Sequence, residues 1–218
     1  LASVGPGNVL KDIIESECFK VVRLTKVFRQ AGESGIVTNA HKINEGKEVK
    51  LDNSFGDFLY IERENAQMAL NATIGLIKTK LPAYVGANEM DIQVLTPMRN
   101  GILGVNSLNP GLQMYMNPPD KNKNEKEIAG VVFREGDKVM QIKNNYTRKW
   151  QSEDGSNSGH GIYNGDIGYI YYIDKEKKEI FVIFDSLKIV TYKYDELDEL
   201  DHSFCTTIHK SQGSEFPI

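Results

Sequence analysis

The sequence has little of what marks secreted, membrane-spanning or metal-binding proteins. Its 218 residues include two cysteines, Cys18 and Cys205, so a disulfide framework is not indicated and a reducing cytoplasm is the expected compartment. No run of about 18 apolar residues is present, which argues against a transmembrane helix. The four histidines are not spaced from the cysteines as metal ligands are, so we expect no metal site. The N-terminal stretch LASVGPGNVL lacks the pattern of a signal peptide, and its start at Leu1 rather than Met leads us to expect a piece of a longer protein.

Charge is unevenly distributed along the chain, whose net charge is −4. Residues 99–149 hold nine Lys/Arg against five Asp/Glu, and residues 150–200 hold five against eleven. In the basic block, cations alternate with Tyr115, Phe133, Tyr146 and Trp150. Cations for phosphates and flat rings for stacking are what a single-stranded nucleic acid site uses. The same pattern fits a solvated face over core aromatics, and charge counts alone favour that second interpretation.

Three helices are predicted in the first hundred residues. Apolar spacing predicts a helix after Asn8, one between the capping residue Ser34 and Gly46, and one over 64–80 with Pro82 beyond its end. The second helix is expected to turn its apolar residues inward, and these are Ile36, Val37, Ala40 and Ile43.

Two short strands are predicted between these helices. Residues 20–25 are a β-branched run of the kind buried in a parallel sheet, and residues 91–97 form a second run that ends at a proline. Helix and strand in alternation indicate an α/β layer with a mostly parallel sheet. In such sheets, ligands gather at the carboxyl ends of the strands.

Beyond about residue 110 the pattern changes to short strands. After a polar stretch at 117–127, strands are predicted near 131–142 and over 166–174, 179–185 and 188–194. Gly, Asp and Lys-rich turns between them indicate a small antiparallel barrel. The Gly/Ser-rich segment 150–161 is expected to be a flexible loop, and a buried strand returns at 202–209.

Several residues next to these strands have the chemistry of a phosphate or nucleotide site. Arg29 follows the first predicted strand, and a guanidinium forks onto phosphate oxygens. Arg99 lies beside Gly101 and Gly104, at the start of a predicted helix whose N–H groups suit an anion. HKSQGSEF, at 209–216, adds hydroxyls, donors and a carboxylate in a tight turn. Each feature alone fits an ordinary surface or turn.

The order of six sequence blocks points to a family. LASVGPGN, FRQ, TPMRNGILGVNSLN, FREGDKVMQIKNNY, YNGDIGYI and TTIHKSQGSEF follow one another over nearly the whole chain. This order resembles the C-terminal motor half of RecD-like helicases, superfamily 1 enzymes that move 5′ to 3′ on single-stranded DNA. The alpha subunit of exodeoxyribonuclease V belongs to this family. The resemblance implies an α/β fold, with an incomplete RecA-like (P-loop NTPase-type) parallel-sheet domain at 1–115 and 200–218. An inserted SH3-like antiparallel β-barrel is implied at 116–199.

The resemblance also implies that parts of the motor lie outside this sequence. The family's Walker A loop and acidic Mg²⁺ motif do not occur here, and LASVGPGN resembles the end of its third motif. HKSQGSEF resembles the fifth motif, and the sixth is expected after Ile218. We therefore expect ATP and Mg²⁺ to be held mainly by the missing N-terminal half. This chain by itself is not expected to hydrolyse ATP.

Roles for individual residues follow from the resemblance by position. Arg29 is implied as the catalytic residue that reaches the γ-phosphate. The implied nucleotide-binding residues are Gln30, Gly213 and Glu215. The residues implied to face the DNA strand are Pro97, Met98, Arg99, Thr207, His209 and Ser211. A second DNA-contacting surface on the barrel is implied at Asn144, Asn145 and Tyr146.

The implied partners are single-stranded DNA, ATP and other subunits of an exodeoxyribonuclease V-type complex in DNA repair or recombination. Two other functions remain open at this point. An SH3-like barrel in a non-catalytic interaction protein binds a proline-rich peptide, which needs an aromatic-lined groove. A nuclease needs a cluster of Asp/Glu with Lys around Mg²⁺, and the sequence shows none, so cleavage by this chain is not expected.

Overall fold

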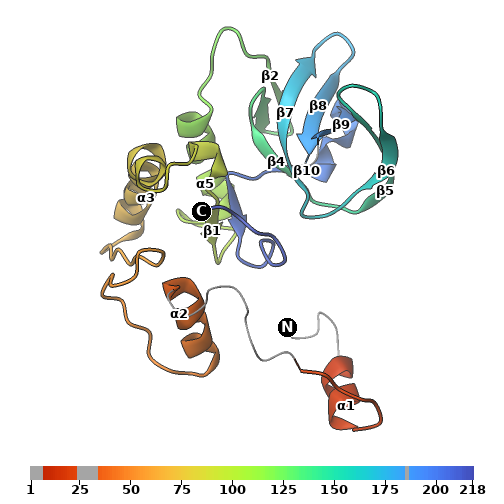
Figure 1. Cartoon of the computed structure of the whole chain (residues 1–218). Coiled ribbons are helices and arrows are strands. Elements are labelled where there is room, and N and C mark those ends of the chain that lie inside the picture. The colour runs from red at the N-terminus through yellow and green to blue at the C-terminus, as the bar shows by residue number, and fades with distance from the viewer. Residues whose placement is uncertain (1–6, 24–33, 185–186) are drawn as a thin grey trace. The chain divides into compact units, whose positions relative to one another are not determined.

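The computed structural model of the chain describes residues 7–23, 34–184 and 187–218. The chain divides into two compact units, residues 1–62 and 63–218, which are described separately (Figure 1). The second unit contains both the barrel and the α/β elements that flank it in sequence. No helix in the described part of the chain combines the length and apolar character needed to cross a membrane.

The first unit contains helices α1 (Val9–Glu15) and α2 (Gly35–Asn44). Ser34 caps α2 as predicted, because its hydroxyl oxygen accepts a hydrogen bond from the Val37 N–H at 3.3 Å. The inward orientation predicted for the apolar residues of α2 is wrong for Ile36 and Ile43, which are 54% and 66% exposed. The described residues of this unit bury no large apolar side chain that would cover this stripe.

The strand predicted at residues 20–25 is also wrong where the structure describes it. Residues 20–23 have no strand partner, and residues 24 and 25 lie outside the described residues. A β-branched run forms a strand only when neighbouring strands satisfy its backbone N–H and C=O groups.

The second unit begins with an almost continuous helix, made of α3 (Ala66–Gly75), the π-helical turn η1 (Leu76–Lys80) and α4 (Leu81–Val85). Pro82 was predicted to lie beyond the helix and instead lies in the first turn of α4. Proline removes one backbone donor and clashes with the preceding turn. At this point the hydrogen bonding widens, since the Leu81 N–H donates to the Leu76 carbonyl, and the helix continues past the proline.

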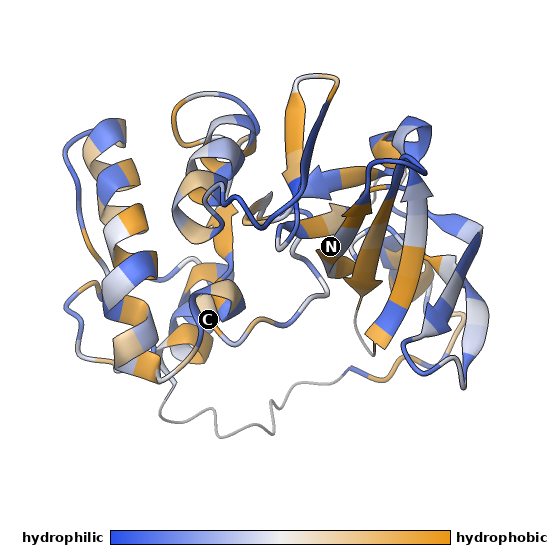
Figure 2. Cartoon of the chain, turned by 90° about the horizontal axis from the view of Figure 1, so that it is seen from above, coloured by the Kyte–Doolittle hydropathy of each residue, from blue (hydrophilic) through white to orange (hydrophobic). Residues whose placement is uncertain are grey.

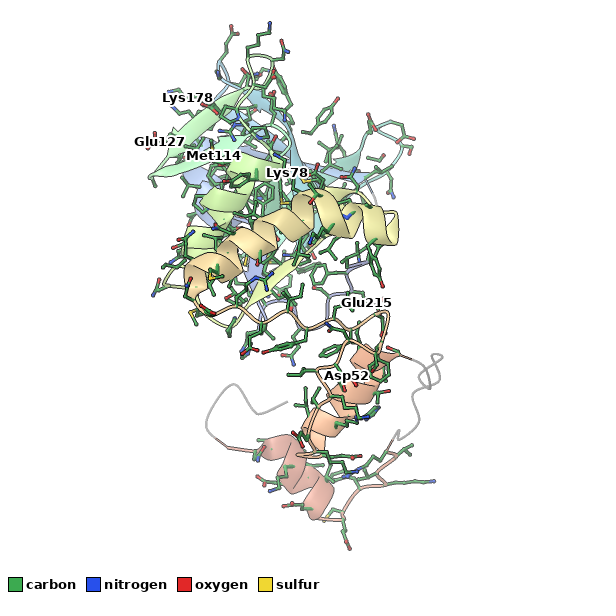
Figure 3. All side chains as sticks on the ribbon, turned by 90° about the vertical axis from the view of Figure 1, so that its left-hand side faces the viewer. Asp52, Lys78, Met114, Glu127, Lys178 and Glu215 are labelled. Atoms are coloured by element: carbon green, nitrogen blue, oxygen red, sulfur yellow. The ribbon has the colours of Figure 1, made fainter. Side chains whose placement is uncertain are left out.

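A small core lies between this helix and the α/β elements that follow. The turn η2 (Glu89–Asp91) leads into strand β1 (Val94–Thr96), which is followed by helix α5 (Val105–Met116). In Figure 3 the α3–α4 helix crosses in front of α5, with Lys78 and Met114 marking the two helices. The buried residues of this core are Ile77, Ile92, Leu108, Leu112, Phe204 and Cys205.

Strand β1 pairs in parallel with strand β11 (Cys205–Thr207), which follows the barrel strands in the sequence. The buried Asn109 of α5 fastens this pair, because its amide donates to the carbonyls of His202 (2.9 Å) and Cys205 (3.0 Å) and accepts from the Cys205 N–H (2.8 Å). The predicted combination of helices with parallel strands is present here. Within the described residues the parallel sheet consists of these two strands.

The barrel is the larger body of the second unit. Its hairpin strands are β2 (Glu125–Ile128) and β3 (Val131–Arg134). Seven described strands form one antiparallel sheet in the order β10-β4-β7-β8-β9-β5-β6. They are β4 (Lys138–Gln141), β5 (Asn145–Ser152), β6 (Ser158–Ile162), β7 (Ile167–Asp174), β8 (Glu179–Phe184), β9 (Lys188–Lys193) and β10 (Leu200–His202). The turn η4 (Tyr194–Glu199) joins β9 to β10. The predicted small antiparallel barrel is therefore confirmed.

Alternation of apolar residues builds the barrel core. Along β8, Ile180, Val182 and Phe184 point inward while the residues between them are half-buried. Facing residues from the other strands complete the core, among them Val139, Ile162, Ile170, Ile173, Val190 and Tyr192. In Figure 2 the barrel strands carry both apolar (orange) and polar (blue) segments. A period of two is what places one face of each strand in the core.

The flexible loop predicted at 150–161 is wrong, because most of that segment is paired. Strands β5 and β6 run to Ser152 and from Ser158, so the connecting loop is only residues 153–157. The small residues in the segment have a packing role. A Cβ at Gly159 would lie 2.6 Å from the Trp150 ring on the neighbouring strand, so only glycine leaves room for the indole.

A buried polar network fastens the barrel to helix α5. The carboxylate of Asp137, directly before β4, is fully buried and accepts hydrogen bonds from Gln113 of α5 and from Asn117, the C-cap of that helix. It also accepts one from the Arg134 N–H at 2.7 Å and is 3.1 Å from Nε2 of His202 on β10. Because α5 also holds the β1–β11 pair through Asn109, barrel and strand pair are joined by one helix.

A buried lysine on β4 gives the fold a pH dependence. Lys138 is 4% exposed, and its ammonium donates to the Met90 carbonyl at 3.0 Å. Burial lowers the pKa of Lys138 to about 8, although nearby Asp91 opposes the shift. The folded state therefore loses this proton at lower pH than the unfolded state, whose lysine has a pKa near 10.5. Stability from this group rises as pH increases from about 8 to about 10.5, by up to about 3 kcal/mol.

We expect Lys138→Met to remove this pH dependence. Between about pH 8 and about pH 10.5, the free energy of unfolding of the wild type should rise relative to that of the variant. Chemical denaturation at pH values between 7 and about 10.5 measures it. The exposed Lys175→Met is the matched control and should leave the profile of the wild type unchanged. Parallel profiles for wild type and Lys138→Met would contradict the assignment.

Candidate nucleic-acid interface

The parallel register of β1 and β11 brings two loops to one edge. Thr96 lies opposite Thr207, and the Ile208 N–H donates to the Thr96 carbonyl at 3.0 Å. The chain therefore leaves both strands at the same level, with Pro97–Arg99 on one side and the turn from Ile208 on the other. Two of the predicted DNA-facing groups, 110 residues apart in sequence, thus lie next to each other.

The loop after β1 is held in shape by the start of α5. The Val105 N–H donates to the Met98 carbonyl at 3.2 Å, and the Asn106 N–H donates to the Arg99 carbonyl at 3.0 Å. A Cβ at Gly104 would lie 2.5 Å from the Asn100 backbone, so this close return requires glycine. The side chains of Met98 (49% exposed) and Arg99 remain at the surface.

Two cations flank a carboxylate at this edge. The Arg99 guanidinium is 3.8 Å from Asp201 of β10, and both side chains are about half exposed. Lys210 lines the same small crevice. Burial lowers the pKa of Lys210, the charge of Asp201 opposes this shift, and the charge of Arg99 adds to it. Two cations near one carboxylate leave a net positive charge, which suits a phosphate.

The turn after β11 carries the remaining predicted residues of this edge. The Thr207 hydroxyl accepts a hydrogen bond from the Lys210 N–H at 3.2 Å, and the Ser211 hydroxyl donates to the Ile208 carbonyl at 2.8 Å. These two hydroxyls shape the turn, while His209 is exposed. Gly213 has a φ of +89°, a conformation that favours glycine. Glu215 follows it in the last segment of the chain (Figure 3).

The three residues predicted on the barrel lie at the start of strand β5 and directly before it. Asn145 begins β5, and its amide donates to both carboxylate oxygens of Glu199 at 3.0 and 3.2 Å. Asn144 accepts a hydrogen bond from the Asn164 N–H. Both asparagines are therefore engaged in the barrel itself. Tyr146 is 69% exposed, and its ring contacts Tyr163 edge to face at 5.7 Å between centroids.

The predicted catalytic Arg29 and its neighbour Gln30 lie outside the described residues. The sequence prediction did not assign a role to Lys210 or to Asp201, which share the crevice with Arg99. Lys210 lies inside the HKSQGSEF block, so the sequence alone could have predicted it as a site residue. Asp201 had no such signal, since it lies 3.8 Å from Arg99 only in the folded chain and is 102 residues away in sequence. No group of three metal-ligating side chains occurs within residues 7–23, 34–184 and 187–218.

Comparison with known families identifies the barrel. Residues 108–184 match the family model described as the SH3 domain of ATP-dependent RecD-like DNA helicases. This match covers most of α5 and the strands from β2 to β8, so the barrel is similar to the SH3 domain of RecD-like helicases.

The similarity extends beyond the barrel. The chain is 31% identical over 195 residues to the ATP-dependent RecD2 DNA helicase of Deinococcus radiodurans, which covers 89% of the chain and 24% of that protein. It is 28% identical over 260 aligned positions to an uncharacterized protein of Methanocaldococcus jannaschii, covering 99% of the chain and 21% of that protein. The resemblance to RecD-like helicases is therefore confirmed over most of the chain. The chain spans between a fifth and a quarter of the length of these relatives.

A solved structure was also compared. The Pif1 helicase from Bacteroides in complex with ADP-AlF3 and single-stranded DNA aligns with 91% of the chain and 44% of its own length, at 15% identity and a TM-score of 0.47.

Proposed function

We propose that this chain is the C-terminal part of an ATP-dependent DNA helicase that moves 5′ to 3′ on single-stranded DNA in DNA repair or recombination. The observation that carries the proposal is the parallel pair β1–β11, which gathers Arg99, Lys210 and the turn at 208–211 at one edge. The similarity to RecD2 and the SH3-like barrel support the same assignment. The α/β elements would then belong to a RecA-like domain interrupted by the barrel.

In this proposal the edge of the β1–β11 pair holds the sugar-phosphate backbone. Arg99 and Lys210 supply positive charge, and the exposed His209 supplies a further donor. Phosphate contacts of this kind position a strand without reading its sequence. That suits a motor, which must step along any base. Pro97, Met98, Thr207 and Ser211 would shape the surface on which the strand lies.

The nucleotide would bind mainly outside this chain in the intact protein. There ATP supplies the γ-phosphate, and Mg²⁺ neutralises its charge. From this chain, Arg29 would reach the γ-phosphate, Gln30 would support it, and Gly213 and Glu215 would line the ribose side. Glu215 is eight residues beyond Thr207, in the segment that follows the turn at 208–213, so in this proposal the turn connects the DNA-facing residues to the nucleotide. Assembly with other subunits of an exodeoxyribonuclease V-type complex is part of the same proposal.

The test removes the two cations of the edge from the 218-residue chain. We expect Arg99→Ala and Lys210→Ala each to weaken binding of an oligothymidylate several-fold, and each to reduce the salt dependence of the affinity by about one charge. Fluorescence anisotropy at several salt concentrations measures both quantities. Lys175→Ala, which removes an exposed lysine from the β7–β8 turn, is the matched control and should bind as the wild type does.

Two results would overturn the proposal. One is a chain that does not bind the oligonucleotide, or whose binding is the same in all three variants. The other is a full-length protein, translated from the complete reading frame, that fails to unwind a forked duplex with ATP and Mg²⁺.

A further inference from the structure

The barrel carries a second surface that the edge of the β1–β11 pair does not use. A groove of about 1030 Å³ is lined by residues of the β5–β6 hairpin and of strands β7, β8 and β9. The hairpin side presents Lys149, Trp150 and His160, and the sheet side presents Tyr171, Tyr172 and Phe181. All of these residues belong to the second unit.

A β-bulge supplies the aromatic side of the groove. The register between β7 and β8 shifts between Ile170 and Tyr172, so Tyr171 is the extra residue. Without the bulge, strict alternation would turn one of two adjacent tyrosines into the core. With it, Tyr171 and Tyr172 are both exposed, at 61% and 46%. Tyr172 lies opposite Phe181, with ring centroids 5.9 Å apart, which makes a continuous aromatic surface.

The charges in the groove favour an anionic occupant. The Arg148 guanidinium binds both Glu196 and Glu199 at 2.9 Å, so these three groups carry one net negative charge, which Lys149 and Lys188 together outweigh. Lys149 is exposed and pairs with no carboxylate among the described residues. Lys188 places its ammonium 5.4 Å from the centre of the Trp150 ring, at the side of the groove. Residues 116–199 hold 13 Lys/Arg against 16 Asp/Glu, so these cations are a local positive site on an acidic domain.

We propose that this groove binds a segment of single-stranded nucleic acid, with bases stacked on Tyr171 and Tyr172 and backbone phosphates near Lys149 and Lys188. The proposal rests on the proposed function, since it gives the same strand a second point of attachment. A proline-rich peptide would find the same rings but gains nothing from Lys149 and Lys188, which pair with no carboxylate among the described residues. Nucleic acid uses both features, because every base has a flat face and every linkage carries a charge.

The test uses Trp150, the single tryptophan of the chain, as a reporter inside the groove. We expect an oligothymidylate to quench its fluorescence. We expect Tyr171→Ala to raise the dissociation constant obtained from this quenching about tenfold. Tyr171→Phe keeps the ring, and its dissociation constant should stay within about twofold of wild type. Lys149→Glu should weaken binding and lower the salt dependence.

Matched controls separate the groove from general effects. Tyr84→Ala removes a tyrosine that is also 61% exposed but lies on α4, and Lys175→Glu reverses a lysine in the β7–β8 turn. Both should bind as the wild type does. Circular dichroism and thermal melting of each variant check that the fold is intact.

The outcomes distinguish this inference from the proposed function. If the oligonucleotide binds in a way that depends on Arg99 and Lys210 but does not quench Trp150, the proposal that the groove binds nucleic acid is wrong. The proposed helicase function is not affected by that result. A proline-rich peptide that quenches Trp150 while the oligonucleotide does not would also overturn the groove proposal. If neither anisotropy nor quenching detects binding of the oligonucleotide, both proposals are wrong.

Discussion

Replacing Asp137 with alanine is expected to lower the free energy of unfolding of the second unit by about 3–5 kcal/mol. One carboxylate oxygen accepts hydrogen bonds from the Arg134 N–H (2.7 Å) and the Gln113 amide (2.6 Å) and lies 3.1 Å from the His202 ring. The other accepts from the Asn117 amide at 2.7 Å. Because Asp137 is fully buried, alanine leaves the Arg134 N–H and one N–H of each amide without an acceptor and without water to replace it.

Two further variants identify the cause. Asp137→Asn keeps the volume but replaces one acceptor by an amide donor that faces other donors, so its loss should be close to that of alanine. Asp195→Ala removes an exposed carboxylate from η4 and should change stability by less than about 0.5 kcal/mol. Urea unfolding followed by Trp150 fluorescence reports on this unit, since Trp150 packs against the barrel core. A midpoint for Asp137→Ala equal to that of the wild type would show that the network does not join the barrel to α5.

Local patterns predicted the barrel well. Strands predicted at 166–174, 179–185 and 188–194 correspond to Ile167–Asp174, Glu179–Phe184 and Lys188–Lys193. Their alternation of apolar and polar residues is a local property that survives in the fold. The cap at Ser34 was predictable for the same reason, because it depends on residues within one turn.

The errors arose where distant contacts override local pattern. The Gly/Ser-rich segment 150–161 forms most of a hairpin, since Trp150 needs the space that Gly159 leaves on the facing strand. The apolar stripe of α2 was expected to be inward, but burial depends on what lies opposite, and a single helix does not contain that information. Likewise, the bulge at Tyr171 depends on how β7 pairs with β8, and the sequence of β7 alone does not contain that information.

The candidate site was partly predictable. The block TPMRNGILGVNSLN and the block TTIHKSQGSEF each carry polar residues after a strand, and the structure places them side by side. Asp201 was not predictable, because it reaches Arg99 only through the course of β10 between barrel and strand pair. The engagement of Asn145 with Glu199 was hidden for the same reason, since 54 residues separate them. The groove, whose lining comes from five strands, has no contiguous signature at all.

Under the proposed function, replacing Arg29 with alanine in the full-length protein is expected to reduce ATP hydrolysis and unwinding by about 10³-fold or more. A guanidinium that contacts the γ-phosphate stabilises the charge that develops during transfer, and alanine offers no substitute. Binding of single-stranded DNA should stay within about twofold of wild type, because the strand is assigned to Arg99, Lys210 and the barrel. Single-turnover hydrolysis, unwinding of a forked duplex and fluorescence anisotropy measure the three quantities.

Arg23→Ala is the matched control for this variant. It removes the same charge six positions earlier, from an exposed residue for which no nucleotide role is proposed, so it should hydrolyse ATP and unwind DNA as the wild type does. Arg29→Lys separates charge from shape: a lysine keeps the cation but loses the forked contact with two phosphate oxygens, and most of the activity should be lost with it. If Arg29→Ala unwinds at nearly the wild-type rate, the arginine does not touch the nucleotide. The coupling between this chain and the ATP site must then run through another residue, for which Glu215 is the next to replace.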